Sequence, residues 1–137
     1  EAATGEASIR GLHLLLAEDN ELNAEIAARL LNDEGATVQV VRDGQQAIDA
    51  FASRPQGTYD AILMDIMMPK IDGYTATRVI RSTNRQDAKA IPIIAMTAHV
   101  FDEDVKQCLE AGMNAHLPKP LQMEKVVSTI ARLCKRK

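Results

Sequence analysis

Short apolar runs alternate with amphipathic helical patterns along almost the whole chain, and this alternation limits the fold more than any other feature. The runs are short and rich in large apolar residues, as buried parallel strands are. We expect five strands, over residues 12–17, 37–41, 60–64, 91–96 and 114–117. Helices are predicted after them, over 21–34, 44–53, 73–82, 102–111 and 122–134, and loops over 54–58 and 84–90. This succession predicts an α/β fold with right-handed crossovers and an open, doubly wound sheet.

The bulk properties fit one domain in a reducing environment. A chain of 137 residues can bury a core that needs no disulfide or metal to hold it, and we expect a flexible linker at 1–10 before a domain at 11–135. The formal net charge of -3 gives no general attraction to nucleic acid, and no apolar run is long enough to cross a bilayer. Cys108 and Cys134 lie among apolar residues at helical spacing, so we predict reduced core thiols in a cytoplasmic protein.

Polar side chains follow four of the five predicted strands. Glu18 and Asp19 follow the first strand, Asp65 the third, Thr97 the fourth and Lys119 the fifth. Open parallel sheets bind ligands outside the carboxyl ends of their strands, so we expect these groups to meet at one edge. Carboxylates placed together repel each other unless a cation neutralises them. The pattern therefore predicts a site for Mg²⁺, which takes oxygen ligands and commonly bridges to a phosphate.

Asp65 is the carboxylate that this pattern places at the centre of the site. A carboxylate can attack phosphorus and form an aspartyl phosphate. Phosphoryl transfer otherwise needs positioning and neutralisation of the phosphoryl oxygens, which Mg²⁺ and Lys119 can supply. The Thr97 hydroxyl can donate to one of those oxygens. We therefore predict Asp65 as a phosphoryl acceptor.

Four segments resemble one known family in order and position. "LLLAEDN", "ILMDIMMPKIDG", "IIAMTAH" and "HLPKP" are similar to the receiver domain of two-component response regulators, and the similarity covers about residues 12–133. It implies a flavodoxin-like (βα)5 fold with the parallel sheet order 2-1-3-4-5. It also implies a phosphoacceptor signalling domain of a phosphorelay, which takes a phosphoryl group from phosphohistidine and switches conformation. Such a domain assists its own phosphorylation and dephosphorylation, so whether the fragment counts as an enzyme stays open.

The resemblance assigns a role to each residue of the acidic cluster. Asp65 is implied to be the phosphoacceptor. Asp19, Asp65 and the backbone carbonyl of Met67 are implied to hold Mg²⁺, with Glu18 assisting through water. This chain carries all of these residues, whereas receivers that act as unphosphorylated interaction modules usually lack one of them.

Three further positions carry the implied response to phosphorylation. Thr97 is the switch hydroxyl, and Lys119 is the amine that binds the phosphoryl group and precedes a cis proline bond to Pro120. The family's aromatic switch position holds His116 here. A histidine can also turn in or out of a pocket and can titrate near neutral pH. The alternative is that His116 is a half-buried strand residue without a switching role.

The subtype and the partners are also implied by resemblance. "EDNELN", "MDIMMP", "DGYTATRVIR" and "MTAH" are similar to receivers at the carboxyl end of hybrid sensor histidine kinases, whose parent chains can be anchored in a membrane. The implied partner is a histidine kinase domain or a histidine-phosphotransfer domain, and we expect neither nucleic-acid nor membrane contact from this segment. A stand-alone response regulator is the alternative.

An apolar stripe on the first predicted helix suggests where a partner binds. With about 100° per residue, the stripe comprises Leu22, Ile26, Ala27, Leu30 and Leu31, and Leu22 stands at its flank. Leu22 is then either an edge-of-core residue or part of a docking patch for a helical phosphotransfer partner.

Two enzyme or cofactor classes compete with the receiver interpretation. A haloacid-dehalogenase-like phosphatase needs a second acid two residues after its nucleophile, and Met67 stands there. A flavodoxin needs a hydroxyl- and glycine-rich phosphate loop after its first strand, where this chain has Glu18 and Asp19. Both classes are therefore disfavoured.

Overall fold

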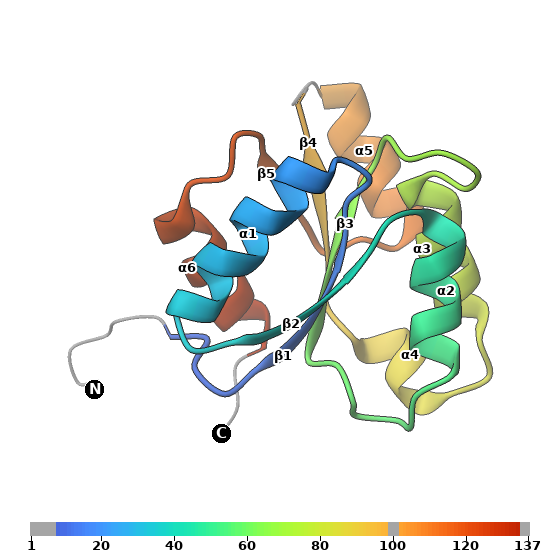
Figure 1. The fold of residues 1–137 in the computed structure, drawn as a ribbon. Coiled ribbons are helices and arrows are strands. Elements are labelled where there is room, and N and C mark those ends of the chain that lie inside the picture. The colour runs from blue at the N-terminus through green and yellow to red at the C-terminus, as the bar shows by residue number, and fades with distance from the viewer. Residues whose placement is uncertain (1–7, 99–101, 135–137) are drawn as a thin grey trace.

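The computed structural model describes residues 8–98 and 102–134 and contains a single five-stranded parallel sheet, drawn as arrows in Figure 1. The strands are His13–Ala17 (β1), Thr37–Val41 (β2), Ala61–Asp65 (β3), Ile93–Thr97 (β4) and Ala115–Pro118 (β5). Their order is β2-β1-β3-β4-β5, and every neighbouring pair is parallel. The sequence-based prediction of a flavodoxin-like doubly wound fold is confirmed.

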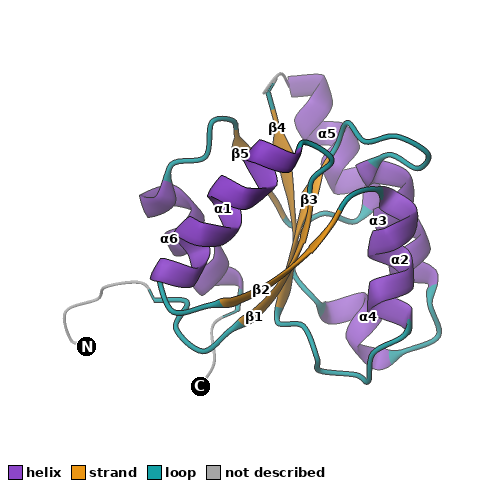
Figure 2. Cartoon of the chain, viewed as in Figure 1, coloured by secondary structure: helices purple, strands orange, loops and turns teal. Residues whose placement is uncertain are grey.

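Helices cover both faces of this sheet. They are Glu21–Asp33 (α1), Gly44–Ala52 (α2), Gly73–Ser82 (α3), Gln86–Ala90 (α4), Asp102–Ala111 (α5) and Met123–Leu133 (α6). Helices α1 and α6 lie on one face, and the other helices lie on the opposite face (Figures 1 and 2). Among the described residues, no helix is both long and apolar enough to pass through a membrane.

Two hydrophobic cores form because side chains alternate between the faces of each strand. Leu15, Ile62 and Met64 point into the core under α2, α3, α4 and α5. Their neighbours Leu14, Leu16 and Leu63 point into the core under α1 and α6. Ile9 is also fully buried in this second core, although it lies within the segment expected as a linker. The strands are thus apolar on both faces, as a sheet covered by helices requires.

One prediction of a loop is wrong, because residues 86–90 form the short helix α4. Arg85, which precedes it, donates to both carboxylate oxygens of Asp87 at 3.0 and 2.9 Å. The Arg85 guanidinium also donates to the Phe51 carbonyl oxygen at 2.9 Å and lies 4.5 Å from the centroid of the Phe51 ring. Ala88 is buried against the core. These tertiary contacts order a segment whose polar composition is typical of a loop.

The predicted stripe of α1 is partly wrong. The buried residues of the helix are Ala24, Ala27 and Leu31. The large apolar side chains of Leu22, Ile26 and Leu30 do not belong to this buried set, because they are 64%, 49% and 36% exposed. Spacing alone does not distinguish large from small apolar residues, whereas in the structure the small side chains of Ala24 and Ala27 are buried. The outer face of α1 is consequently apolar.

Candidate functional site

Three carboxylates converge at the carboxyl edge of the sheet. Asp65 is the last residue of β3, and Glu18 and Asp19 follow β1, its neighbour in the sheet. One carboxylate oxygen from each of the three residues lies within 4.8 Å of the others. Glu18 and Asp65 are each only 3% exposed, whereas Asp19 is exposed to solvent. The predicted acidic cluster therefore forms, with two buried members and one open to water.

Lys119 binds the two buried carboxylates directly. Its Nζ lies 2.8 Å from Oδ2 of Asp65 and 2.9 Å from Oε1 of Glu18. Burial by itself lowers the pKa of this ammonium, but its hydrogen bonds to Asp65 and Glu18 and their negative charges outweigh burial, so its pKa is raised. The backbone N–H of Lys119 also donates to the Thr97 carbonyl at 2.8 Å. The amine is therefore held charged beside the Asp65 and Glu18 carboxylates.

The donor set fits a divalent cation. When the three carboxylates are ionised, Lys119 compensates one of their charges and leaves two. Backbone N–H groups satisfy further oxygens: Asn20 donates to Oε2 of Glu18 at 3.1 Å, and Met67 donates to Oδ1 of Asp65 at 3.3 Å. Hard carboxylate oxygens at short mutual distance are the ligands that Mg²⁺ prefers. Exposed Asp19 leaves one side of the cluster accessible.

The loop after β3 carries the remaining ligand that the resemblance implies. Met67 lies two residues beyond Asp65, with its side chain 75% exposed. The loop is closed at its base, where the Gly73 N–H donates to the Ile66 carbonyl at 2.9 Å. The role of the Met67 carbonyl as a ligand stays a prediction. The lysine bond to Pro120 is cis, as the resemblance implies.

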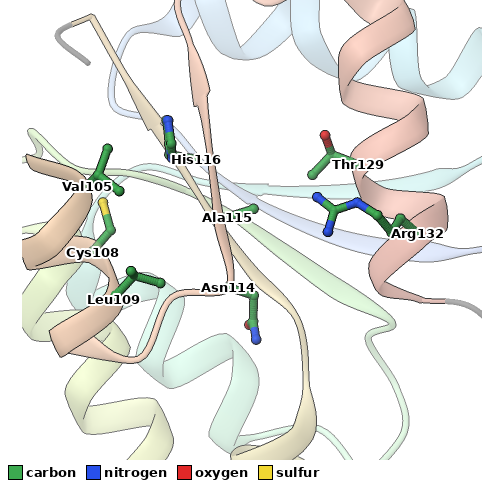
Figure 3. A pocket seen from close by; sticks show the side chains of 8 residues that line it. All are labelled: Val105, Cys108, Leu109, Asn114, Ala115, His116, Thr129 and Arg132. Atoms are coloured by element: carbon green, nitrogen blue, oxygen red, sulfur yellow. The ribbon is translucent and has the colours of Figure 1, made fainter. Parts of the chain in front are cut away.

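Thr97 and His116 lie on the two strands beyond β3. Thr97 ends β4 and is 7% exposed, and β5 pairs its Pro118 with Thr97. His116 on β5 is half-buried and lines a groove between α5 and α6, which Figure 3 shows from close by. It stands three residues before Lys119 on the same strand and loop. Strand β5 therefore connects this groove with the acidic cluster.

The structure adds an apolar groove that the sequence analysis missed. It lies beside the acidic cluster, between α1 and the segment after β5, and is lined by Glu18, Asn23, Ile26, Ala27, Leu30, Lys119, Pro120 and Leu121. The groove was not predicted because Ile26 and Leu30, which line it, were expected in the buried stripe. The alanines at 24 and 27 were the available signal, because a helix that packs closely on a sheet favours small residues at the contact.

The fold and the cluster define a class of protein: a doubly wound α/β module with a carboxylate cluster, suited to a divalent cation, at the carboxyl edge of its sheet. The sequence profile of the response regulator receiver domain matches residues 14–131. The chain belongs to this family and is a receiver domain of a two-component phosphorelay.

Similar proteins include receiver regions of much longer kinases. Histidine kinase 1 of Arabidopsis thaliana is 38% identical over 158 residues, which cover 93% of this chain and 13% of the relative. The osmosensing histidine protein kinase SLN1 of Saccharomyces cerevisiae is 38% identical over 125 residues, covering 88% of this chain and 10% of the relative. The transcription factor SKN7 of the same yeast is 39% identical over 126 residues, which cover 92% of this chain and 19% of the relative. The chain thus spans less than a fifth of each of these relatives.

A solved structure of a similar protein has the same fold. The receiver domain of a sensor histidine kinase from Pseudomonas aeruginosa superposes with a TM-score of 0.81 at 38% identity, over 92% of this chain and 99% of that one. That protein holds a magnesium ion in its active site cleft.

Proposed function

We propose that Asp65 accepts a phosphoryl group from a phosphohistidine and that the domain changes conformation as a result. The observation that carries this proposal is the contact of Lys119 with Asp65 inside a cluster of three carboxylates, at the carboxyl edge of a receiver fold. Asp65 ends β3, the central strand of the five-stranded sheet, between β1 and β4. It can therefore be reached by groups from both neighbours.

The transfer requires attack on phosphorus and stabilisation of the charge on the phosphoryl oxygens. A carboxylate oxygen of Asp65 forms the new bond to phosphorus as the bond to the histidine nitrogen breaks, and the imidazole leaves with the electron pair. Glu18, Asp19, Asp65 and the Met67 carbonyl would hold Mg²⁺, which supplies positive charge to the phosphoryl oxygens when bound. The charged Lys119 ammonium, which contacts Asp65, would neutralise negative charge on one phosphoryl oxygen.

The conformational response is assigned to the residues beyond β3. Thr97 donates its hydroxyl to a phosphoryl oxygen and thereby draws the start of the loop after β4 toward the site. His116 is proposed to change its environment when Thr97 moves, because β5 lies beside β4 and pairs His116 with Ala95. The half-buried position of His116 beside a groove supports this role.

We propose that the parent protein is a hybrid sensor histidine kinase located in the cytoplasm or facing it. The similar kinases of Arabidopsis and yeast support this origin, whereas the similar yeast transcription factor supports the alternative of a separate response regulator. The domain limits of 11–135 remain a prediction, and the burial of Ile9 favours a start at or before that residue.

The partner is proposed to be a histidine kinase domain or a histidine-phosphotransfer domain that docks on the outer face of α1. The exposed residues Leu22, Ile26 and Leu30 form an apolar surface there, and Ile26 and Leu30 continue into the groove that Lys119 also lines. Residues that contribute most to binding cluster near the centre of an interface, in well-packed and desolvated positions. A helix of the partner that covers this surface would place its phosphohistidine near Asp65.

The test of the acceptor is direct. Incubation with a small phosphodonor and magnesium should add one phosphoryl group to the protein, and Asp65→Asn should add none. Unchanged mass of the wild type, or equal labelling of the variant, would overturn the assignment.

The magnesium site is tested separately. Asp19→Asn should weaken magnesium binding because a neutral amide replaces a carboxylate ligand. Asp33→Asn, which changes another exposed acid at the far end of α1, is the control and should bind as the wild type does. Equal affinity in all three proteins would contradict the site.

A further inference from the structure

The loop between the acceptor and α3, residues 66–72, leans against the amino end of α2. Lys70, near the tip of the loop, has a left-handed backbone with φ of 69°. Its Nζ lies 3.7 Å from Oδ2 of Asp43, a buried carboxylate whose other oxygen caps α2 through the Gln46 N–H at 2.8 Å. The loop that follows Asp65 is thus attached to a helix that contributes nothing to the acidic cluster itself.

Gly44, the first residue of α2, makes the closest approach to this loop. A Cβ atom at Gly44 would collide with the carbonyl oxygen of Ile71 and would lie 2.8 Å from the carbonyl carbon and 2.9 Å from Cβ of the same residue. The backbone of Gly44 is not left-handed, and alanine is the better helix former. Space for the Ile71 carbonyl is therefore the reason that glycine is needed here.

The loop has little freedom to yield to such a collision. Its base is closed by the Gly73 N–H on the Ile66 carbonyl, and Gly73 itself has no room for a Cβ beside the Asp65 carbonyl oxygen. On its inner side, Met68 and Ile71 pack against the core under α2 and α3. A displacement of Ile71 must consequently be taken up by the residues between it and Ile66, and Met67 is one of them.

We propose that Gly44 is a positioning residue for the magnesium site. Its missing side chain lets the Ile71 carbonyl rest on α2, and this contact holds the 66–72 loop in the place where the Met67 carbonyl and the Asp65 carboxylate can bind one ion. The proposal rests on the proposed function, because it assumes that magnesium binds at the acidic cluster. It predicts that the packing of α2, away from the acids, controls metal affinity.

The test compares two glycine variants of the same chain. Gly44→Ala should weaken magnesium affinity by about tenfold, the lower end of the range for residues that orient metal ligands. Gly35→Ala is the control. Alanine is also unfavourable at Gly35, which has a φ of 96° and no room for a Cβ beside Arg10. Gly35, however, precedes β2 and so lies at the edge of the sheet opposite the acidic cluster. Amide spectra during a magnesium titration give the affinity without any need for activity.

A second measurement separates positioning from loss of chemistry. With a small phosphodonor, Gly44→Ala should raise the magnesium concentration for half-maximal labelling of Asp65, while the rate at saturating magnesium stays close to that of the wild type. If Gly44→Ala does not fold, Ile71→Ala decides, because it removes the side chain that seats the loop on the core without creating a collision. It should likewise weaken magnesium binding.

The possible outcomes are distinct. If the wild type binds no magnesium, the proposed function fails. If the wild type binds magnesium and the folded Gly44→Ala protein, or Ile71→Ala in its place, binds it equally well, the positioning role alone is overturned. An equal loss of affinity in Gly35→Ala would also overturn it, since the effect would then follow from general destabilisation.

Discussion

Replacement of Lys119 by methionine should destabilise the folded domain, because it leaves two buried carboxylates without their shared cation. The Glu18 and Asp65 side chains are 4% and 5% exposed, and Nζ of Lys119 contacts them at 2.9 and 2.8 Å. Removing one partner of a buried ion pair costs about 3–5 kcal/mol. The Lys119 side chain is itself 23% exposed, so the pair is not fully desolvated. We therefore expect a loss near the lower limit, about 3 kcal/mol.

Urea unfolding followed by circular dichroism, without magnesium at neutral pH, measures this loss. Lys125→Met is the control, because Lys125 is exposed on α6 and its replacement should change the free energy of unfolding by no more than about 0.5 kcal/mol. Magnesium should restore part of the stability of Lys119→Met. An ion that binds only the folded state adds about 2.7 kcal/mol at a concentration of one hundred times its Kd.

The pH dependence identifies the cause. At the alkaline end, the folded protein has the higher pKa for Lys119, so its contribution is complete below about pH 10.4, the ordinary lysine value, and is lost as pH rises through the folded pKa. If the variant is as stable as the wild type at neutral pH, or if its deficit stays the same as pH rises through the Lys119 pKa of the folded state, the reasoning is refuted.

Two further substitutions and one spectroscopic measurement test the switch and the partner surface. Thr97→Ala should still accept a phosphoryl group but lose the amide shifts that phosphorylation causes after β4, and a wild-type pattern of shifts would contradict the switch. The imidazole signals of His116 should change on phosphorylation, whereas unaltered signals would favour a structural role. Leu22→Asp should slow transfer from a phosphotransfer partner by at least about tenfold, a hot-spot effect, with small-donor labelling and thermal stability nearly intact. Leu109→Asp on α5 is its control, since Leu109 is 62% exposed against 64% for Leu22. Equal slowing with the small donor and with the partner would show that Leu22 does not act through partner docking.

The strands and the acidic cluster follow from local features of the sequence, whereas the strand order was implied by the family resemblance. Each strand is an apolar run with a charged or hydroxyl residue at or just beyond its end, as at Glu18, Asp65 and Thr97. In a parallel sheet all carboxyl ends lie at one edge, so residues that are far apart in the sequence must meet there. The apolar run of each strand and the polar residue at its end are sufficient to predict this cluster, because both are properties of single strands.

Tertiary packing decided what lies around the cluster. Residues 84–90 are polar, yet 86–90 form a helix because Arg85 binds Asp87 and Phe51. The apolar residues of α1 likewise did not reveal that Leu22 and Ile26 are exposed by 64% and 49%. The need for glycine at position 44 is likewise invisible in the sequence, because it arises from the approach of Ile71. Periodicity gives the faces of a helix but not which face is covered. That choice depends on the distances between elements, which only the assembled sheet and helices set.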